Sequence, residues 1–297
     1  MSYPEIATRM FNTPLMLHEA KGDIIARAFG PRVLGLPDAE LDVRGSQELG
    51  LVGDKMGQVR DSSGERYFQP WRRDDVAVIE IEGSLINKGK WIGKSSGQTT
   101  YEGIITQANA VIDDDSVRGV IVEVDSFGGE VSGAFDCAER LFELSQVKPT
   151  IAVLTDHACS AGYLLASAAR QIVIPRNGYA GSIGVISLHV DMSKWLAKEG
   201  LAVTILKAGA QKADLNPYEP LPDDVLEREL ADLEAIRVEF AETVARFRGD
   251  RLSKDAALAT EAGVFRGQAA VEAGIADAVG RPSQILAAFQ EELGRSA

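Results

Sequence analysis

The sequence contains few cysteines, few histidines and no long apolar run. Cys137 and Cys159 are the only two cysteines among 297 residues, so a disulfide framework is not indicated and a reducing, cytosolic setting fits best. No apolar stretch approaches the roughly 20 residues that a membrane-spanning helix needs. The first residues also lack the basic region and the apolar core of a secretion signal. We therefore expect a protein that neither enters a membrane nor is secreted.

Positive charge is scarce as well. The 44 acidic residues outnumber the 31 basic ones and give a formal net charge of -13. Because this excess repels a phosphate backbone and an anionic lipid surface alike, we expect no direct nucleic-acid binding and no membrane partner. The remaining composition, 45% hydrophobic and 25% charged, is ordinary for a folded soluble protein.

From Asp75 onward, short β-branched runs alternate with helical patterns. We predict strands over residues 76–81, 120–124, 151–154, 172–174, 185–190 and 203–206. Helices are predicted over residues 101–113, 133–145 and 222–249, the last of them long and amphipathic. This alternation predicts an α/β fold with a largely parallel central sheet.

The composition divides the chain into three parts. Residues 1–73 are expected to form an N-terminal segment and linker, in which the first 43 residues indicate helices and turns and the rest is rich in glycine, serine and charge. Residues 74–280 carry the series of strands and helices and form the expected main domain. Residues 281–297 are expected to form a C-terminal helical tail.

The stretch DHACSAGYLLAS places an imidazole, a thiol and a hydroxyl at the end of a predicted strand. Cys159 would need a base or a positive field to form a thiolate at neutral pH, and a buried, inert cysteine is the commoner case. His157 precedes Ser160 by only three residues, and such close neighbours seldom present both side chains to one proton. The other histidines, His18 and His189, fit structural or surface roles. A cysteine site, a Ser/His/Asp triad and a serine with another base all remain open.

Ser160 lies at a predicted strand-to-helix junction and is followed by two small residues, Ala161 and Gly162. Small residues let a substrate backbone approach closely, and the free N–H groups at the start of a helix suit a developing oxyanion. The glycines of Ser126-Phe-Gly-Gly129 could supply a second N–H donor. Taken alone, the same residues also fit an N-cap serine and a tight turn.

Four motifs follow one another along the chain. They are Asp125-Ser-Phe-Gly-Gly-Glu130, Ala158-Cys-Ser-Ala-Gly162, Ala180-Gly-Ser-Ile-Gly-Val185 and Ala208-Gly-Ala-Gln-Lys-Ala213. In order and in separation they resemble the D-[ST]-P-G-G signature, the nucleophile segment, the G-S-I-G-V segment and the general-base segment of the S49 signal peptide peptidase family. The resemblance covers about residues 75–280. Phe127 departs from the family, which usually has proline there, and this change should alter the rigidity of the turn while leaving the Gly129 N–H in place.

One branch of that family is especially similar. The segments that carry this similarity are Phe11-Asn-Thr-Pro-Leu-Met-Leu17, Ser132-Gly-Ala-Phe-Asp-Cys-Ala138, Asn216-Pro-Tyr218 and Leu221-Pro-Asp-Asp-Val225. They resemble the capsid-assembly (prohead) proteases of lambda-like tailed phages. Because a scaffolding segment follows the protease domain in those proteins, the resemblance implies here either a separate scaffold or a shortened chain.

The resemblance implies a Ser/Lys dyad with Ser160 as the nucleophile and Lys212 as the general base. An exposed lysine has a pKa of about 10.4 and is charged at neutral pH, whereas burial in an apolar pocket can lower that value by several units. The resemblance also implies that Ser182 orients the lysine and that the backbone N–H groups of Gly129 and Ala161 bind the oxyanion. It implies no metal and no diffusible cofactor.

The fold implied by the resemblance is the Clp protease/crotonase-like arrangement of stacked β-α units, whose members form homo-oligomeric rings. The implied activity is that of a serine endopeptidase that acts on scaffold, portal or capsid proteins, or on itself, in the host cytoplasm inside the phage prohead. Residues 87–100 and 207–221 are the expected edges of substrate binding, where an extended peptide could add as a strand. The alternatives are a host cytoplasmic signal-peptide-peptidase-like protease, a non-catalytic capsid assembly protein on the same fold, and a CoA-binding crotonase-type enzyme.

Overall fold

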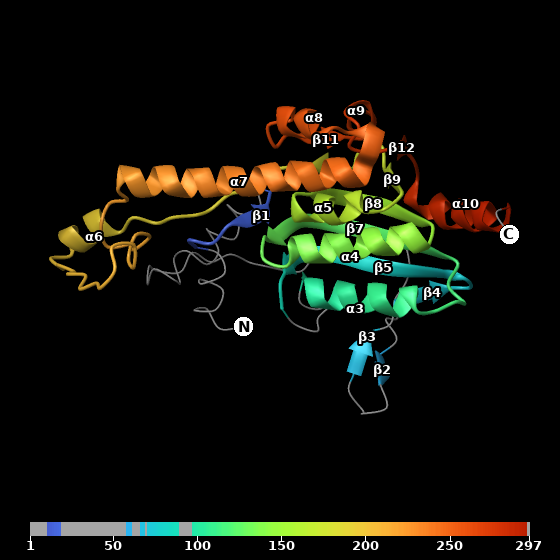
Figure 1. Cartoon of the computed structure of the whole chain (residues 1–297), viewed down its shortest axis with the longest axis horizontal. Helices are drawn as coiled ribbons and strands as arrows, with labels where there is room; N and C mark the ends of the chain where they lie inside the picture. Colours follow the sequence, from blue (N-terminus) through green and yellow to red (C-terminus); the bar gives the residue numbers. More distant parts are fainter. Residues whose placement is uncertain (1–10, 19–57, 61–65, 69, 89–96, 296–297) are drawn as a thin grey trace.

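The computed structural model describes residues 11–18, 58–60, 66–68, 70–88 and 97–295, and Figure 1 shows their arrangement. The strands are β1 (Leu15–Leu17), β2 (Gln58–Arg60), β3 (Arg66–Phe68), β4 (Trp71–Arg73), β5 (Val76–Ile86), β6 (Gln98–Thr100), β7 (Gly119–Glu130), β8 (Thr150–Cys159), β9 (Gln171–Ile174), β10 (Tyr179–Gly181), β11 (Val264–Arg266) and β12 (Ala278–Val279). The helices are α3 (Tyr101–Ile112), α4 (Ala134–Val147), α5 (Ala161–Ser167), α6 (Ser193–Lys198), α7 (Asp223–Arg248), the 3-10 turn η1 (Gly249–Arg251), α8 (Lys254–Ala259), α9 (Gln268–Glu272) and α10 (Pro282–Arg295). The predictions for residues 1–10 and 19–43, and most of the predicted linker, lie outside the described residues.

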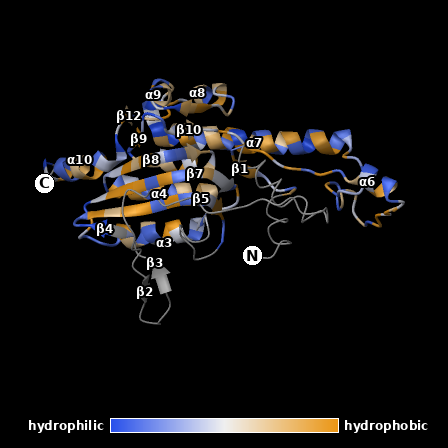
Figure 2. Cartoon of the chain, turned by 180° about the vertical axis from the view of Figure 1, so that it is seen from behind, coloured by the Kyte–Doolittle hydropathy of each residue, from blue (hydrophilic) through white to orange (hydrophobic). Residues whose placement is uncertain are grey.

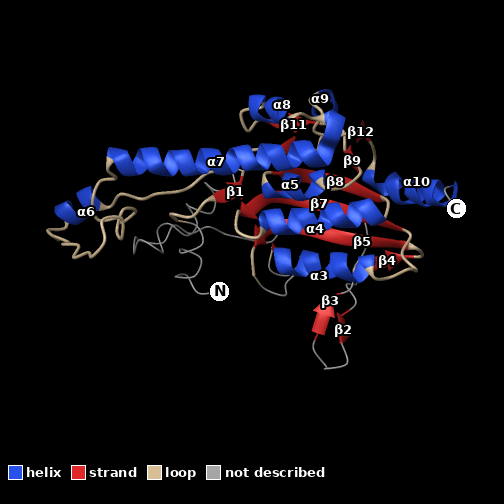
Figure 3. Cartoon of the chain, viewed as in Figure 1, coloured by secondary structure: helices blue, strands red, loops and turns tan. Residues whose placement is uncertain are grey.

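One sheet joins all the described strands except the separate β2–β3 pair. Its path runs β11-β10-β8-β7-β5-β4, with β1 beside β7, β6 beside β5, β9 beside β8 and β12 beside β9. The pairs among β5 to β10 and β12 are parallel, whereas β1, β4 and β11 each run antiparallel to their neighbour. Figure 3 shows helices packed against this sheet. The prediction of an α/β fold with a largely parallel central sheet is therefore confirmed.

Helices pack on both faces of the sheet, which explains the apolar runs that predicted the strands. α3, α4 and α5 share a large core with buried strand residues such as Ile79, Val122 and Leu154. α10 packs on the other face, where Phe289 and Leu293 lie against the alternate strand residues. Parallel strands that are covered on both sides are apolar at nearly every position, and the first six residues of β7 are indeed buried.

Local signals set the ends of the predicted helices. The Thr100 hydroxyl accepts a hydrogen bond from the Gly103 N–H at 3.2 Å and so caps the start of α3. α4 begins after Gly133, which has a positive φ of 85°, and α7 begins after Pro222 and ends at Gly249. All three predicted helices are confirmed.

Two of the predicted strands do not form as expected. Residues 203–206 form no strand and are largely exposed, because no described strand lies beside them. Residues 185–190 make only isolated bridges, and both bridges go to N-terminal residues: Ile186 to Leu15 and Leu188 to Phe11. Leu15 itself belongs to a strand, not to the helix or turn that its surroundings predicted. β-branched residues favour a strand only where a partner edge is available.

Between β10 and α7 the chain leaves the sheet. We call residues 193–222 the arm; it begins with α6 and then runs without regular structure to the start of α7. α7 has 26 residues, and its first half extends past the sheet beside the arm (Figure 1). Among the described residues, no helix is both long and apolar enough to cross a bilayer.

A buried ion pair ties the end of α7 to the sheet. The Arg248 guanidinium is fully buried and donates hydrogen bonds of 2.9 Å to both carboxylate oxygens of Asp277. The same carboxylate accepts a hydrogen bond of 2.7 Å from the Ile172 N–H of β9. Burial by itself would raise the pKa of Asp277, but the hydrogen bonds and the charge of Arg248 outweigh it and hold that pKa below its usual value.

We expect Asp277→Asn to lower the free energy of unfolding by about 3–5 kcal/mol, because it leaves the Arg248 charge buried without its partner. Urea unfolding at pH 7 measures this loss. The pKa of Asp277 is lower in the folded protein than in the unfolded chain, where it is about 3.9. The carboxylate therefore stabilises the fold fully above pH 3.9, and this stabilisation is lost as the pH falls through the pKa of the folded protein. The difference between wild type and variant should therefore shrink in acid. The control is Glu242→Gln, which removes the exposed pair with Lys254 and should change stability by less than about 1 kcal/mol.

Candidate functional site

Ser160 occupies a tight turn between β8 and α5. Its backbone has φ 56° and ψ -123°, a conformation that residues other than glycine rarely adopt, and the residue is 1% exposed. The Ser160 N–H donates to the Gly181 carbonyl at 2.8 Å, and the Ser160 carbonyl accepts from the Leu164 N–H at 2.9 Å. The Ser160 hydroxyl lies 3.4 Å from the Gly184 carbonyl oxygen. Strained residues of this kind persist only where the surrounding structure holds them, and they cluster at functional sites.

The double glycine at the end of β7 lies directly beside Ser160. Gly128 has φ 102°, and a Cβ atom there would lie 3.0 Å from the Ser160 Cβ and 2.0 Å from the Met16 carbonyl oxygen. A Cβ atom on Gly129 would lie 1.8 Å from the Leu85 carbonyl oxygen. Both positions therefore require glycine, because the neighbouring backbones approach too closely for any side chain. The two predicted oxyanion donors flank the serine, since Gly129 follows Gly128 and Ala161 follows Ser160.

The Ser126 side chain links the end of β7 to β5. Its hydroxyl donates to the Gly83 carbonyl at 2.6 Å and accepts from the Gly128 N–H at 3.1 Å. The Ser126 carbonyl oxygen would lie 2.9 Å from a Cβ atom on Gly162. The small residue after Ala161 is thus needed for packing between α5 and β7, which sequence reasoning assigned to substrate approach.

Ser182 lies in the same cluster. It is buried, has a positive φ of 58°, and directly follows Gly181, whose carbonyl accepts the Ser160 N–H. The Ser182 N–H donates to the Gly263 carbonyl at 2.9 Å, so the β10–β11 contact fixes its backbone.

Lys212 lies elsewhere in the single chain. It is exposed on the arm, where it lines a hollow together with Asp214 and Arg228. The backbone N–H of Lys212 donates a hydrogen bond to the Gly209 carbonyl at 3.2 Å. Within the described residues, no hydrogen bond joins Lys212 to Ser160. One chain therefore brings together Ser160, Ser182 and the two oxyanion donors, but not the predicted base.

The cysteine alternative fits the structure poorly. Cys159 is buried, and burial, together with the charge of Asp125, raises the pKa of its thiol to about 12. Burial also raises the pKa of Cys137. Both sulfurs are therefore protonated at neutral pH, and neither is an activated nucleophile.

The described contacts of the three histidines go to groups other than Ser160. The His157 ring stacks on Phe127 at 4.2 Å, and its Nδ1 lies 3.4 Å from Asp156. His189 Nδ1 lies 3.0 Å from the Asn12 side-chain oxygen, and the His18 ring meets Phe127 edge-on. These contacts give a Ser/His/Asp triad no geometric support.

Three potential metal ligands do gather beside this ring stack. Asp125, Asp156 and His157 each offer a ligand atom within 4.8 Å of the others. Asp156 is exposed, and a surface group of this composition is not by itself a metal site.

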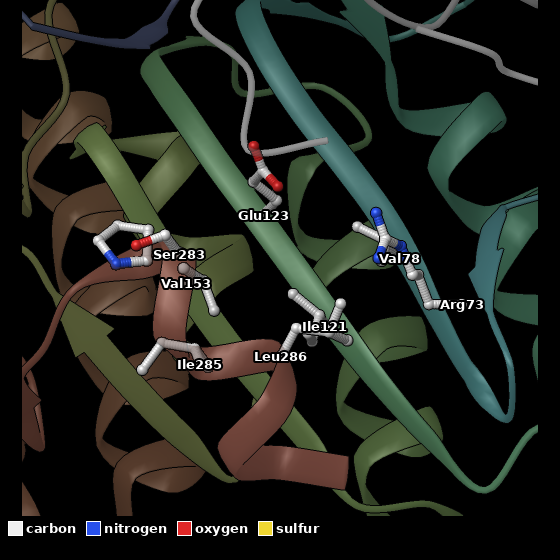
Figure 4. A pocket seen from close by; sticks show the side chains of 9 residues that line it. Arg73, Val78, Ile121, Glu123, Val153, Ser283, Ile285 and Leu286 are labelled. Carbon is white, nitrogen blue, oxygen red and sulfur yellow. The ribbon is translucent and has the colours of Figure 1, made fainter. Parts of the chain in front are cut away.

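A second hollow, of about 160 Å³, lies where α10 meets the sheet (Figure 4). Ile121 and Val153 of the sheet and Ile285 and Leu286 of α10 form its apolar walls, and Glu123 reaches it from β7. Its lining includes none of the predicted site residues, so it is a seam between α10 and the sheet.

Sequence reasoning did not place residues 11–18 at the site. The structure pairs Met16 with Gly129 and Leu17 with Gly128, directly beside Ser160. The Phe127 carbonyl of β7 extends this pairing, because it accepts a hydrogen bond from the His18 N–H at 2.9 Å. The only signal in the sequence was the resemblance of Phe11–Leu17 to the phage branch, which gave no position in space.

We expect Cys159 to resist alkylation. Because its thiol is buried and its pKa is raised to about 12, iodoacetamide at pH 7.5 should leave the folded protein unmodified at this position. Intact-mass spectrometry before and after unfolding measures how many of the two cysteines have been alkylated. Rapid modification of Cys159 in the folded protein would instead revive the cysteine alternative.

Comparison with known proteins agrees with the motifs. Residues 143–295 match the model of peptidase family S49. The chain is 35% identical to capsid assembly protease C of Escherichia phage lambda, over 98% of this chain and 66% of that one. It is 36% identical to the head-tail preconnector protein GP5 of Enterobacteria phage P21, over 92% of this chain and 54% of that one. The chain thus spans less than two thirds of the length of either relative.

Among solved structures, a membrane-bound stomatin-specific protease in complex with a substrate peptide has a TM-score of 0.43 and 16% identity, over 71% of this chain and 77% of that one. The family match covers more than half of the chain and contains Ser160, Ser182 and Lys212. The family predicted from the four motifs is confirmed: the chain belongs to peptidase family S49.

Proposed function

We propose that the protein is a serine endopeptidase in which Ser160 is the nucleophile and Lys212 the general base. The observation that carries the proposal is the turn at Ser160, where a buried serine has φ 56° and lies directly beside the double glycine of β7. Such a conformation is costly for a serine, and an N-cap serine would not need it.

The chemistry follows from the residues around the turn. The Ser160 hydroxyl attacks the carbonyl carbon of a peptide bond while the neutral Lys212 amine takes its proton. The N–H groups of Gly129 and Ala161 stabilise the charge on the carbonyl oxygen. The lysine then returns the proton to the leaving amine, and water hydrolyses the ester. Ser182, which directly follows the Gly181 whose carbonyl accepts the Ser160 N–H, orients the amine.

This mechanism requires Lys212 to reach Ser160, either by movement of the arm or from another copy of the chain. The arm and the first half of α7 carry exposed apolar side chains, and Leu206 is 93% exposed. The others are Trp195, Leu201, Val203, Tyr218, Leu226 and Leu230. Figure 2 shows apolar residues on this extended part of α7. Exposed apolar surfaces of this kind mark interfaces, so a homo-oligomer, such as a ring, would bury them.

The phage relatives suggest the setting. We infer that the substrates are scaffold, portal or capsid proteins, or copies of the chain itself, and that cleavage takes place inside the prohead in the host cytoplasm. The relatives' names, a capsid assembly protease and a head-tail preconnector protein, support a role in phage capsid assembly. The net charge of -13 is consistent with protein partners rather than nucleic acid or membrane.

A second function is favoured by one observation. Because Lys212 and Ser160 are not in contact within one chain, a non-catalytic capsid assembly protein on the same fold would also explain the structure. A host signal-peptide-peptidase-like protease would share the proposed chemistry and differ only in its substrate.

Reaction with a serine-directed fluorophosphonate separates these functions. We expect labelling of the wild-type protein at Ser160 and none in Ser160→Ala. In Lys212→Ala the labelling rate should be at least about 100-fold lower, because general-base catalysis typically accelerates a reaction by at least that factor. Lys207→Ala is the matched control on the same arm and should keep the wild-type rate. No labelling of the wild-type protein in any assembly would favour the non-catalytic function.

Mixing the two inactive variants tests how the site is completed. If Lys212 is supplied by another copy, co-assembly of Ser160→Ala with Lys212→Ala should restore part of the labelling. If the arm moves within its own chain, the mixture should stay inactive. Full activity of Lys212→Ala alone would require another base.

A further inference from the structure

The edge of β7 beside Ser160 is not left open. β8 pairs with β7 as far as Ala158 and then ends, whereas β7 continues through Gly128 and Gly129. β1 takes the place of β8 along this extension and runs antiparallel to it, with Met16 opposite Gly129. β1 lies at the end of the sheet where β7 ends (Figure 1). A strand of the chain itself thus lies on the strand that carries a proposed oxyanion donor.

The Met16 carbonyl group faces that donor. Leu15 exchanges two backbone hydrogen bonds with Ile186 on the other side, at 2.8 and 2.9 Å. Successive residues of a strand direct their N–H and C=O groups to opposite edges, so those of Met16 point towards Gly129. The Met16 oxygen and the Ser160 Cβ both lie within 3.0 Å of the point where a Cβ on Gly128 would be. The peptide bond between Met16 and Leu17 therefore lies beside the proposed nucleophile.

Residues 11–18 are held along both edges. On one edge the His18 N–H donates to the Phe127 carbonyl, and on the other the Asn12 N–H donates to the Leu188 carbonyl, both at 2.9 Å. The Asn12 side chain also donates to the Leu215 carbonyl at 2.8 Å, which links this segment to the arm that carries Lys212. β7 and residues 186–188 form the two edges of this groove. Of the edges expected from sequence, residues 207–221 contribute the Leu215 carbonyl, and most of residues 87–100 lie outside the described residues.

We propose that residues 11–18 are a built-in occupant of the peptide-binding groove, bound in the position of a substrate, and that they must leave before another chain can be cut. This inference rests on the proposed function of Ser160. An extended peptide held between two strand edges gains its affinity from backbone hydrogen bonds and its selectivity from the pockets for alternate side chains. Met16 is 0% exposed, so the pocket next to the scissile bond accepts an apolar side chain, and the true substrates carry one there.

A reversible disulfide between β1 and residue 186 tests whether β1 must leave the groove. Leu15 and Ile186 form a hydrogen-bonded antiparallel pair, in which Cα atoms lie about 5.5 Å apart, a separation that suits a disulfide. In Leu15→Cys/Ile186→Cys, oxidation should lower the rate of fluorophosphonate labelling at Ser160 at least tenfold, and dithiothreitol should restore it. The single-cysteine variants are the controls, and the native cysteines are both buried. Equal labelling of the oxidised and reduced forms would overturn the inference.

A second measurement does not depend on catalysis. In Leu15→Cys with Ser160→Ala, the new thiol is covered while the strand is bound, because Leu15 is only 4% exposed. We expect iodoacetamide to modify it in the folded protein, and a peptide with the sequence of residues 11–18, added in excess, to raise the rate several-fold by competing for the groove. Modification only on global unfolding, with no effect of the peptide, would make β1 a permanent strand. Failure of the wild-type protein to label at Ser160 would contradict the proposed function instead, and the alkylation would still decide whether the strand leaves.

Discussion

The strained turn at Ser160 is the constraint on which the rest of the site depends. A serine keeps φ 56° only because several backbones hold it: the Gly181 carbonyl accepts its N–H, α5 starts directly after it, and Gly128 presses against its side chain. A Cβ atom on Gly128 or on Gly181 would clash with a neighbouring backbone oxygen, which is why glycines lie beside the serine. The site is therefore a meeting point of close-packed strand ends, not a pocket lined by large side chains.

The unequal lengths of β7 and β8 have a direct consequence for binding. Because β8 ends at Cys159, the last residues of β7 present backbone groups that need a partner. An extended peptide can satisfy them, and β1 does so in the single chain. Asn12 connects this strand to the arm through Leu215, so occupation of the groove and the position of the arm are physically linked.

The sheet with its covering helices, which we call the body, differs from the arm in how it is stabilised. The body has apolar helices on both faces of its sheet and a buried Arg248–Asp277 pair that fixes the end of α7 to β9. The arm has few buried residues and leaves large apolar side chains such as Leu206 exposed. A segment with little buried surface can change position at small energetic cost, whereas the turn at Ser160 cannot. The proposed base thus lies on the movable part and the proposed nucleophile on the rigid part.

The sequence by itself determined the α/β class, the three main helices and the family, because periodicity and short motifs are local properties. It also singled out Ser160, Ser182, Gly129 and Ala161, which the structure places in one cluster. It could not show that residues 203–206 would have no strand to pair with, or that Lys212 would lie on an exposed arm. Only the tertiary structure decided that Leu15–Leu17 lies beside Ser160, because strand pairing joins backbone edges far apart in the chain, and backbone hydrogen bonds leave almost no mark on the choice of side chains.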